Sequence, residues 1–322
     1  MTLDRSFTLN DGRVIPAIGL GTFLSKPDEV TKAVEIANEH EVGIALSNLQ
    51  KSNPNFKRED LWLTSKTWNS FHRQEYITKG LDQTLKDLGT DYLDLYLVHW
   101  PVHFKPQPSP DGKNAVSLMP LSTIPVDPEI PEVALDTELS CTEVWKSMIQ
   151  LRETGKVKSI GVSNFPVRIL KTIIAETGVV PAVNQVEAHP LLLQDDLVEY
   201  CKEQNIHISA YAPLGNNLQG ELRIIDHEVV KKLASELGKT PAQVLIAYGV
   251  KRGYSVLPKS VNESRIRSNF ENFELPDDAY NQLVELGRKQ PLRYNIPVNF
   301  SPRWSVNIWD SEVEKSATHR AF

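Results

Sequence analysis

Short apolar runs alternate with amphipathic stretches along most of this chain. Leu61–Lys66 and Leu93–His99 are rich in leucine and bounded by polar or turn residues, so each has the character of a buried parallel strand. The stretch between them, Glu75–Leu88, is predicted to be a helix. Strands that alternate with helices in this way predict right-handed βαβ units around a parallel sheet.

The same alternation extends from an N-terminal hairpin to residue 259. Phe7–Leu9 and Val14–Pro16 flank Asn10-Asp11-Gly12, which suits a tight turn. Further strands are predicted at Ala17–Thr22, Val157–Asn164, Ala182–Glu187, His207–Pro213 and Ser255–Lys259. Further helices are predicted at Thr142–Thr154, Val167–Glu176, Gln194–Gln204, Asp226–Leu237 and Pro241–Lys251. We expect an α/β fold with a parallel barrel, formed as a single domain over residues 1–322.

Two segments do not follow the alternation. Val102–Asp136 is rich in proline, and loops of this length inside a domain are usually lids, binding loops or disordered stretches. It follows the strand that ends at His99, so we expect it over the active-site face of a barrel, with a plain surface insertion as the alternative. The tail over residues 292–322 is aromatic but aperiodic, which suits a second covering loop.

Composition narrows the class of protein. Hydrophobic residues make up 40% and charged residues 24% of the chain, as in ordinary globular proteins. The net charge of −6 argues against a surface for nucleic acid or anionic membranes. Cys141 and Cys201 form no metal-binding or disulfide pattern, so we expect no metal site. Without an apolar leader or a membrane-length apolar run, a cytoplasmic location is expected.

Lys66 and His99 are the first candidates for chemistry, because each ends a predicted strand. In a parallel barrel, functional side chains project from the carboxyl ends of strands. A single histidine after a strand is more often a packed or hydrogen-bonded residue, so the surrounding motifs decide between the two interpretations.

Those motifs resemble the aldo-keto reductases, a family of NAD(P)H-dependent carbonyl reductases built as a TIM-type (β/α)8 barrel. The similarity covers nearly the whole chain. The motifs that carry it are GLGT at Gly19–Thr22, REDLWLTSKTW at Arg58–Trp68, DYLDLYLVHWP at Asp91–Pro101, GVSNF at Gly161–Phe165, NQVEAHP at Asn184–Pro190, AYAPLG at Ala210–Gly215 and LPKSV at Leu257–Val261.

The resemblance implies NADP(H) as the cofactor. Ser163, Asn164 and Gln185 match positions that hydrogen-bond the nicotinamide carboxamide, and Tyr211 matches the aromatic residue on which the ring stacks. Further cofactor positions are Thr22, Leu214 over the pyrophosphate, Lys259, Ser260, Val261 and Arg265 around the 2′-phosphate, and Asn269 near the adenine. Taken alone, a Lys-Ser pair would more often mark a helix N-cap.

The resemblance also implies a substrate pocket for small carbonyl or alcohol molecules. Phe23, Trp68 and Trp100 match aromatic walls that select apolar aldehydes and ketones, although Trp68 alone would suit an ordinary core equally well. The resemblance points to a monomer or homodimer, with neither nucleic acid nor membrane as a partner.

One part of the family pattern is missing. Relatives use an Asp and a Tyr beside the Lys and His. The Tyr protonates the carbonyl oxygen, the Lys lowers the pKa of the Tyr, the Asp anchors the Lys, and the His orients the carbonyl. Here Val30–Ala37, which resembles the first helix, runs directly into Asn38–Leu46, which resembles the second. The intervening strand and loop are absent, so we expect a barrel that lacks one strand and its general acid.

Three functional interpretations follow. The first is a carbonyl reductase with weak or no activity. The second is a non-catalytic protein that binds NADPH as a scaffold or sensor. The third is an unstable product of a faulty gene model, with a longer enzyme as the real protein.

Overall fold

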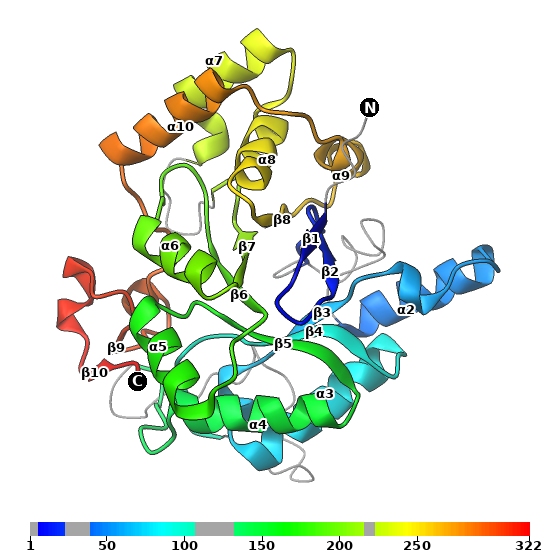
Figure 1. Ribbon diagram of the computed structural model, residues 1–322, viewed down its shortest axis with the longest axis vertical. Coiled ribbons are helices and arrows are strands. Elements are labelled where there is room, and N and C mark those ends of the chain that lie inside the picture. The colour runs from blue at the N-terminus through cyan, green and yellow to red at the C-terminus, as the bar shows by residue number, and fades with distance from the viewer. Residues whose placement is uncertain (1–5, 23–38, 107–131, 216–222) are drawn as a thin grey trace. The chain divides into compact units, whose positions relative to one another are not determined.

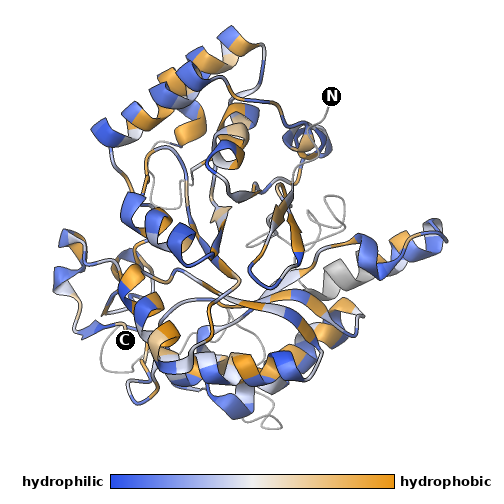
Figure 2. Cartoon of the chain, in the orientation of Figure 1, coloured by the Kyte–Doolittle hydropathy of each residue, from blue (hydrophilic) through white to orange (hydrophobic). Residues whose placement is uncertain are grey.

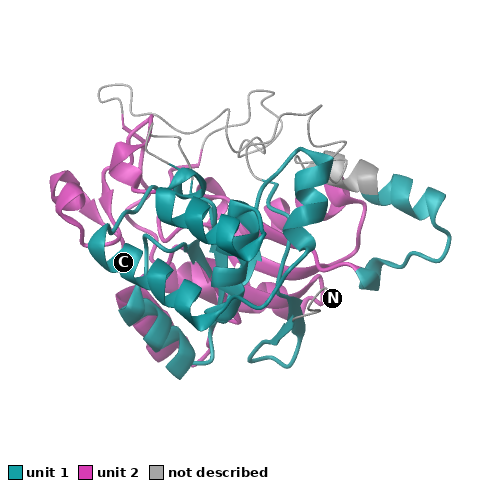
Figure 3. Cartoon of the chain, turned by 90° about the horizontal axis from the view of Figure 1, so that it is seen from above, with its two compact units in different colours: residues 1–60, 185–294 teal, residues 61–184, 295–322 magenta. Residues whose placement is uncertain are grey.

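The computed structural model describes residues 6–22, 39–106, 132–215 and 223–322, and the chain divides into two compact units (Figure 3). Unit 1 comprises residues 1–60 and 185–294, and unit 2 comprises residues 61–184 and 295–322. Each unit therefore combines two separate stretches of sequence. The expectation of one domain over the whole chain stays a prediction. Among the described residues, no helix is long and apolar enough to cross a membrane.

Unit 1 begins with the predicted hairpin. Strands β1 (Ser6–Thr8) and β2 (Val14–Pro16) pair antiparallel (Figure 1). The N–H of Leu9 donates to the carbonyl of Arg13 at 2.8 Å, which closes the turn. Gly12 has a φ of 83°, a left-handed conformation that glycine adopts without steric cost. The hairpin prediction is confirmed.

The segment predicted as the first barrel strand, Ala17–Thr22, runs alongside β8 (Ser255–Leu257). Gly21 forms a parallel bridge with Lys259, and its N–H donates to the carbonyl of Pro258 at 3.0 Å. The pairing consists of isolated bridges, so this segment runs parallel to β8 without the regularity of a full strand.

Most of unit 1 is helical. Its helices are α2 (Glu39–Ser52), η1 (Arg58–Asp60), α6 (Asp195–Glu203), η3 (Ile224–Asp226), α7 (Glu228–Leu237), α8 (Pro241–Lys251), α9 (Glu263–Phe270) and α10 (Asp277–Lys289). Thr240 and Gln243 form a reciprocal capping box at the start of α8. In Figure 1, α7, α8 and α10 gather together, and buried residues such as Val230, Tyr248 and Leu283 join them in one core cluster.

Helices α9 and α10 were not predicted from the sequence. A helix-start signal is present at Asn262, whose side-chain oxygen accepts the N–H of Arg265 at 3.1 Å. The signal lies inside the stretch that the family resemblance assigns to cofactor binding. A cofactor motif and the first turn of a helix therefore occupy the same residues.

Unit 2 contains the strands that position Lys66 and His99. Its parallel strands are β3 (Thr64–Thr67), β4 (Leu93–Val98) and β5 (Val157–Ser163), and its helices are η2 (Asn69–Phe71), α3 (Gln74–Leu88), α4 (Cys141–Glu153) and α5 (Val167–Thr177). Figure 2 shows both polar and apolar residues on each of α3, α4 and α5. Their apolar residues are buried, as for Leu81, Met148 and Leu170, which is the amphipathic pattern that predicted them.

The parallel strands follow chain order, β3-β4-β5-β6-β7-β8, with β6 at Val183–Glu187 and β7 at His207–Tyr211. Helices alternate with these strands along the chain. This is the topology of a TIM-type α/β fold, and the predicted fold class is confirmed. Strand β3 stands at one end of the order.

The C-terminal tail, assigned from the sequence to an aperiodic loop, contains short ordered elements. These are η4 (Pro297–Asn299), β9 (Val306–Asn307), η5 (Glu312–Ser316) and β10 (His319–Arg320). Arg168 of α5 donates to the carbonyls of Asn307 and Ile308 at 3.3 and 3.2 Å. The tail is therefore attached to the helical layer of unit 2.

The proline-rich loop is described only at its two ends. Phe104 and Leu135 form an antiparallel bridge there, and the N–H of Asp136 donates to the carbonyl of His103 at 2.8 Å. Residues 107–131 lie outside the described part of the chain, as do residues 23–38, which include the predicted helix Val30–Ala37 and its junction with Asn38.

Candidate active site

Lys66 and His99 lie near the ends of neighbouring strands in unit 2. Lys66 is the third residue of β3 and stands opposite Leu97 of β4. His99 follows β4, and its N–H donates to the carbonyl of Thr67 at 3.2 Å. The parallel register therefore brings the two residues to the same edge of the sheet, although their catalytic role stays a prediction.

The environment of His99 favours the neutral imidazole. Burial, and secondly the nearby Lys66 cation, lower the pKa of His99 well below its ordinary value. The Trp68 ring packs edge-on against His99, with centroids 5.0 Å apart. A neutral imidazole offers one N–H donor. His99 is thus suited to orienting a carbonyl oxygen by a hydrogen bond.

Ser163 and Asn164 end the next strand, β5, and are buried. Asn164 adopts a left-handed φ of 64°. Its side-chain amide donates to the carbonyl of His99 at 3.0 Å and to the Ser163 hydroxyl at 3.2 Å. A non-glycine residue held in this conformation often marks a functional position. Asn164 therefore joins the His99 main chain to the Ser163 hydroxyl.

Trp68 and Trp100 belong to a larger group in unit 2. The aromatic cluster comprises Trp68, Trp100, Phe104, Phe300 and Trp304. Trp304 is its centre, because it packs edge-to-face against all four other members at centroid distances from 4.8 to 6.1 Å. Phe104, Phe300 and Trp304 were not predicted as site residues. The aromatic composition of the tail was the available signal for two of them.

A buried histidine pair also escaped prediction. Nδ1 of His72 and Nδ1 of His103 lie 2.8 Å apart, and Nε2 of His103 lies 3.7 Å from the Cys141 sulfur. Burial lowers the pKa of His103 to about 4, and burial together with the charge of His103 lowers that of His72. Arg73 pairs with Asp136 nearby, at 2.7 and 3.0 Å.

Several buried polar atoms between Thr67 and His72 have no hydrogen-bond partner within the described part of the chain. They are Thr67 Oγ1, Trp68 Nε1, both amide atoms of Asn69, and His72 Nε2. Buried polar groups in proteins are nearly always hydrogen-bonded to protein, water or a ligand. So many buried polar atoms without a partner make the segment from Thr67 to His72, at the end of β3, an unusual part of the core.

Gln185 and Tyr211 occupy strands β6 and β7 in unit 1. Gln185 is buried, and Tyr211 is half-buried at the end of its strand. Burial, and secondly the charge of Glu187, raise the pKa of Tyr211 well above its ordinary value. The next residue, Ala212, has a φ of 48°, which is uncommon for a residue with a side chain. Tyr211 is therefore a neutral aromatic platform beside a strained turn.

The predicted phosphate-binding residues follow β8. Lys259 and Arg265 are exposed, and within the described residues Arg265 has no ion-pair partner. The Ser260 hydroxyl accepts the N–H of Asn262, and Asn262 rather than Ser260 caps α9. Exposed cations beside a hydroxyl and a helix start fit a phosphate dianion.

The other predicted cofactor residues are placed in the same unit. Thr22 follows Gly21, which pairs with Lys259, and Leu214 packs against the core cluster of α7, α8 and α10. Val261 is half-buried, and Asn269 is buried on α9. Phe23, predicted in the substrate pocket, lies outside the described residues.

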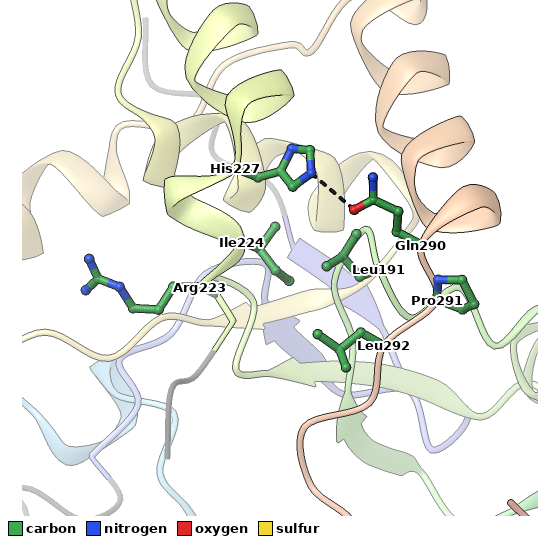
Figure 4. Close-up of a pocket in the computed structure, with 7 residues that line it drawn as sticks. All are labelled: Leu191, Arg223, Ile224, His227, Gln290, Pro291 and Leu292. Carbon is green, nitrogen blue, oxygen red and sulfur yellow. Dashed lines mark hydrogen bonds between the residues drawn. The ribbon is translucent and has the colours of Figure 1, made fainter. Parts of the chain in front are cut away.

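A surface hollow of about 300 Å³ in unit 1 involves none of the predicted site residues (Figure 4). Leu191, Ile224 and Leu292 contribute apolar side chains, and His227 Nε2 lies 3.4 Å from the Gln290 amide oxygen. Arg223 at its rim already binds Asp226 at 2.7 Å. The hollow therefore presents no uncompensated charge that would define a ligand.

Known proteins similar to this chain include reductases and a dehydrogenase. The sequence profile of the Aldo/keto reductase family matches residues 35–288. A D/L-glyceraldehyde reductase of Hypocrea jecorina is 41% identical over 342 aligned positions, which cover 100% of this chain and 99% of the relative. A glycerol 2-dehydrogenase (NADP(+)) of the same organism is 35% identical, covering 96% and 99%.

Solved structures agree with the sequence comparison. An aldose reductase from Schistosoma japonicum superposes with a TM-score of 0.80 and 36% identity, covering 91% of this chain and 95% of that one. The alignment to the glyceraldehyde reductase is longer than the 322 residues of this chain, so the relative has residues that this chain lacks.

Proposed function

Because this chain belongs to the aldo/keto reductase family, we propose that it is an NADP(H)-dependent oxidoreductase that reduces aldehydes or ketones to alcohols, with activity lowered by the loss of its general acid. The observation that carries the proposal is the arrangement in unit 2. Lys66 and His99 share one strand edge, Asn164 binds the His99 main chain, and Trp68 packs on the His99 ring.

The residues of this chain fit the cofactor in chemistry. Tyr211 would stack the nicotinamide ring, Gln185 would bind its carboxamide, and Lys259 and Arg265 would bind the 2′-phosphate. The cofactor supplies a hydride when bound. The relative named for NADP(+) supports the phosphorylated form of the cofactor.

The substrate would be a small carbonyl compound. His99, as a neutral donor, would orient the carbonyl oxygen, while the aromatic cluster would contact the carbon skeleton. The name of the glyceraldehyde reductase makes a short hydroxyaldehyde the first substrate to assay. The aromatic walls keep apolar aldehydes as the alternative.

Three observations support the loss of the general acid. No tyrosine occurs before Tyr76, so none lies between the hairpin and β3. The family profile begins at residue 35, after the GLGT motif at Gly19–Thr22, and the alignment to a relative is longer than the chain. A missing general acid lowers turnover by about 10²–10⁴-fold. His99 is a poor replacement because its lowered pKa leaves very little of it in the protonated, acidic form at neutral pH.

A second function, a non-catalytic NADPH-binding scaffold or sensor, is favoured by the same imbalance: the cofactor residues are present and the acid is not. An unstable gene product is the remaining alternative. Compact folding with tight NADPH binding and no turnover would support the scaffold. Broad thermal unfolding and no binding would support the unstable product.

The test is a titration with NADPH that follows quenching of tryptophan fluorescence. We expect saturable binding, weakened at least tenfold by Arg265→Ala and Lys259→Ala, since each would remove a charged phosphate contact, commonly about 1.5–3 kcal/mol. Lys232→Ala is the matched control, because this exposed lysine pairs with Glu236 on α7, away from the predicted phosphate-binding residues.

Turnover separates the enzyme from the scaffold. Steady-state oxidation of NADPH with glyceraldehyde should be slow, and should rise at least a hundredfold when the relative's segment is inserted before Asn38. No gain in a folded, NADPH-binding insertion variant would contradict the proposed cause of low activity.

A further inference from the structure

Arg168, in the first turn of α5, binds two stretches of the C-terminal tail within unit 2. Its guanidinium donates to the carbonyls of Asn307 and Ile308 at 3.3 and 3.2 Å, and also to the carbonyl of Ala321. The carboxylate of Asp310 lies 3.5 Å from its Nε. The Arg168 side chain is 28% exposed, so these contacts are partly shielded from water. Hydrogen bonds from a charged donor are stronger than neutral ones, so one side chain attaches the tail firmly to the helical layer.

The same two stretches of the tail are also bonded to each other and to a second helix. Strand β10 pairs parallel with β9, with Arg320 opposite Asn307. The N–H of Ala321 donates to the carbonyl of Asn307 at 3.0 Å. The N–H of Cys141, at the start of α4, donates to the main-chain oxygen of Phe322 at 3.0 Å. This part of the tail is therefore held against both α4 and α5.

Trp304 lies two residues before β9 and is the centre of the aromatic cluster. On its other side in the chain, the carbonyl of Arg303 accepts the N–H of Val133 at 2.8 Å. The Trp304 ring packs on Trp68 at 6.1 Å between centroids, and Trp68 packs on His99 at 5.0 Å. The tail is therefore connected to the candidate catalytic histidine through two ring contacts.

The aromatic cluster is closed in this structure. Trp68, Trp100, Phe104 and Trp304 are each less than a tenth exposed. Interiors packed in this way contain few voids, so a bulky aromatic substrate can enter only if a ring moves, whereas a short hydroxyaldehyde needs less space. Trp304 and Phe300 belong to the tail, so their freedom to move depends on how firmly the tail is held.

We propose that Arg168 is a positioning residue that fixes Trp304 and thereby makes the pocket prefer short carbonyl compounds to bulky aromatic ones. The proposal rests on the proposed function, because it requires the carbonyl substrate to lie against the aromatic cluster. A ligand that binds only a displaced form of a protein loses affinity in proportion to the rarity of that form. By holding the tail, Arg168 keeps the displaced form of Trp304 rare. It therefore opposes binding of the bulky compound more than binding of the short one.

The experiment measures, by calorimetry, the dissociation constants of glyceraldehyde and benzaldehyde for the NADP⁺ complex of the full chain, which requires no turnover. Arg168→Met removes the charge and the donors at similar side-chain length. We expect it to lower the ratio of the benzaldehyde constant to the glyceraldehyde constant by about fivefold or more. The NADP⁺ constant should not change, because the contacts of Arg168 with the tail involve no predicted cofactor residue.

Two further substitutions of arginine define the effect. Arg168→Lys retains the charge but not the planar fork that serves several carbonyls, so its ratio should lie between those of the unmodified chain and Arg168→Met. Arg152→Met, at an exposed position on α4, is the matched control and should leave the ratio unchanged.

Trp304→Leu tests whether Arg168 acts through the ring. It should lower the ratio in the same direction, and adding Arg168→Met to it should change the ratio no further, because both variants release the same group. The near-ultraviolet circular dichroism of the tryptophans should weaken in Arg168→Met, since loosely held rings lose their asymmetric surroundings. It should not weaken in Arg152→Met.

The ratio separates positioning from a structural role. If Arg168→Met lowers stability but leaves the ratio of the two constants unchanged, the inference is overturned and the proposed function stands. If the unmodified chain binds NADP⁺ but neither aldehyde, the proposed function and the inference are both overturned. If Arg168→Met does not fold, Asp310→Asn weakens the same attachment from the tail side, and a lowered or an unchanged ratio in that variant supports or overturns the inference.

Discussion

A buried histidine is paired with another polar side chain in each unit, and the two pairs compared here differ in the partner of the histidine. In unit 2, His72 faces His103 through two imidazole nitrogens 2.8 Å apart. In unit 1, His189 binds the Glu187 carboxylate at the same distance. Within the described residues no carboxylate is hydrogen-bonded to the first pair, and its pKa values are lowered. The second pair contains an anion that is held ionised.

The difference shows that burial alone does not determine how a histidine pair responds to acid. Two buried imidazoles destabilise each other's protonated form, because each added charge lacks compensation in a low-dielectric interior. A carboxylate with several donors tolerates burial because its charge is satisfied by hydrogen bonds. We therefore expect the pair in unit 2 to be sensitive to acid and the pair in unit 1 to be sensitive to removal of its anion.

The largest effect is expected from Glu187→Ala. The change leaves His189 and the N–H of Tyr294 without their buried acceptor, which should lower the free energy of unfolding by about 3–5 kcal/mol. Urea unfolding at pH 7 measures it. Glu203→Ala, on an exposed face of α6, should stay within about 0.5 kcal/mol. If Glu187→Ala lowers the free energy of unfolding as little as the control does, the buried anion does not set the pair in unit 1 apart from the pair in unit 2.

Acid should weaken the pair in unit 2. The pKa of His103 falls from the ordinary 6.5 to about 4 in the folded state, so the unfolded chain binds more protons between these values. Stability should therefore fall as the pH drops from about 6.5 to about 4, by about 3 kcal/mol from this residue, with His72 acting in the same direction. Urea midpoints measured across this range would test it; a flat profile would contradict it. Glu187, whose pKa is lowered, keeps its contribution until the pH falls below the ordinary carboxyl value of 4.5, at the lower end of this window.

A smaller effect is expected from His103→Phe. Phenylalanine has a ring of similar size, but His72 loses its hydrogen bond to His103, which costs about 1–3 kcal/mol at pH 7. The loss of stability between pH 6.5 and 4 should shrink in the same variant. His319→Phe, at an exposed position on β10, is the control. If His103→Phe loses as much stability between pH 6.5 and 4 as the unmodified chain, then groups other than His103 cause that loss.

The sequence predicted most of the secondary structure where apolar periodicity was strong. The helix predicted at Pro241–Lys251 has those bounds in the structure, and the helix at Gln74–Leu88 begins one residue before its predicted start. The strand predicted at Leu61–Lys66 is shifted to Thr64–Thr67, because main-chain pairing with β4 rather than apolar character sets its limits. Ends of elements depend on such pairing and caps, which hydrophobic patterns do not contain.

The candidate site was predicted in part. Motifs identified Lys66, His99, Asn164 and Tyr211, and the fold places the first three around the ends of β3, β4 and β5. Trp304 was missed because its partners Trp68 and Trp100 lie some two hundred residues earlier in the sequence, a separation that no local pattern spans. His103 was missed for a related reason: its partners, His72 and Cys141, are brought to it from two other elements.

By itself, the sequence determined the class of fold and the family and supplied the candidate site residues, because alternating strands and helices and ordered motifs are properties of neighbouring residues. Tertiary structure decided which charges are buried together. Glu187 and His189 are already adjacent in the NQVEAHP motif, yet only folding adds the N–H of Tyr294, more than a hundred residues away, and brings Tyr211 under their influence. The free energy of a buried charge depends on everything that surrounds it, and those surroundings exist only after the chain has packed.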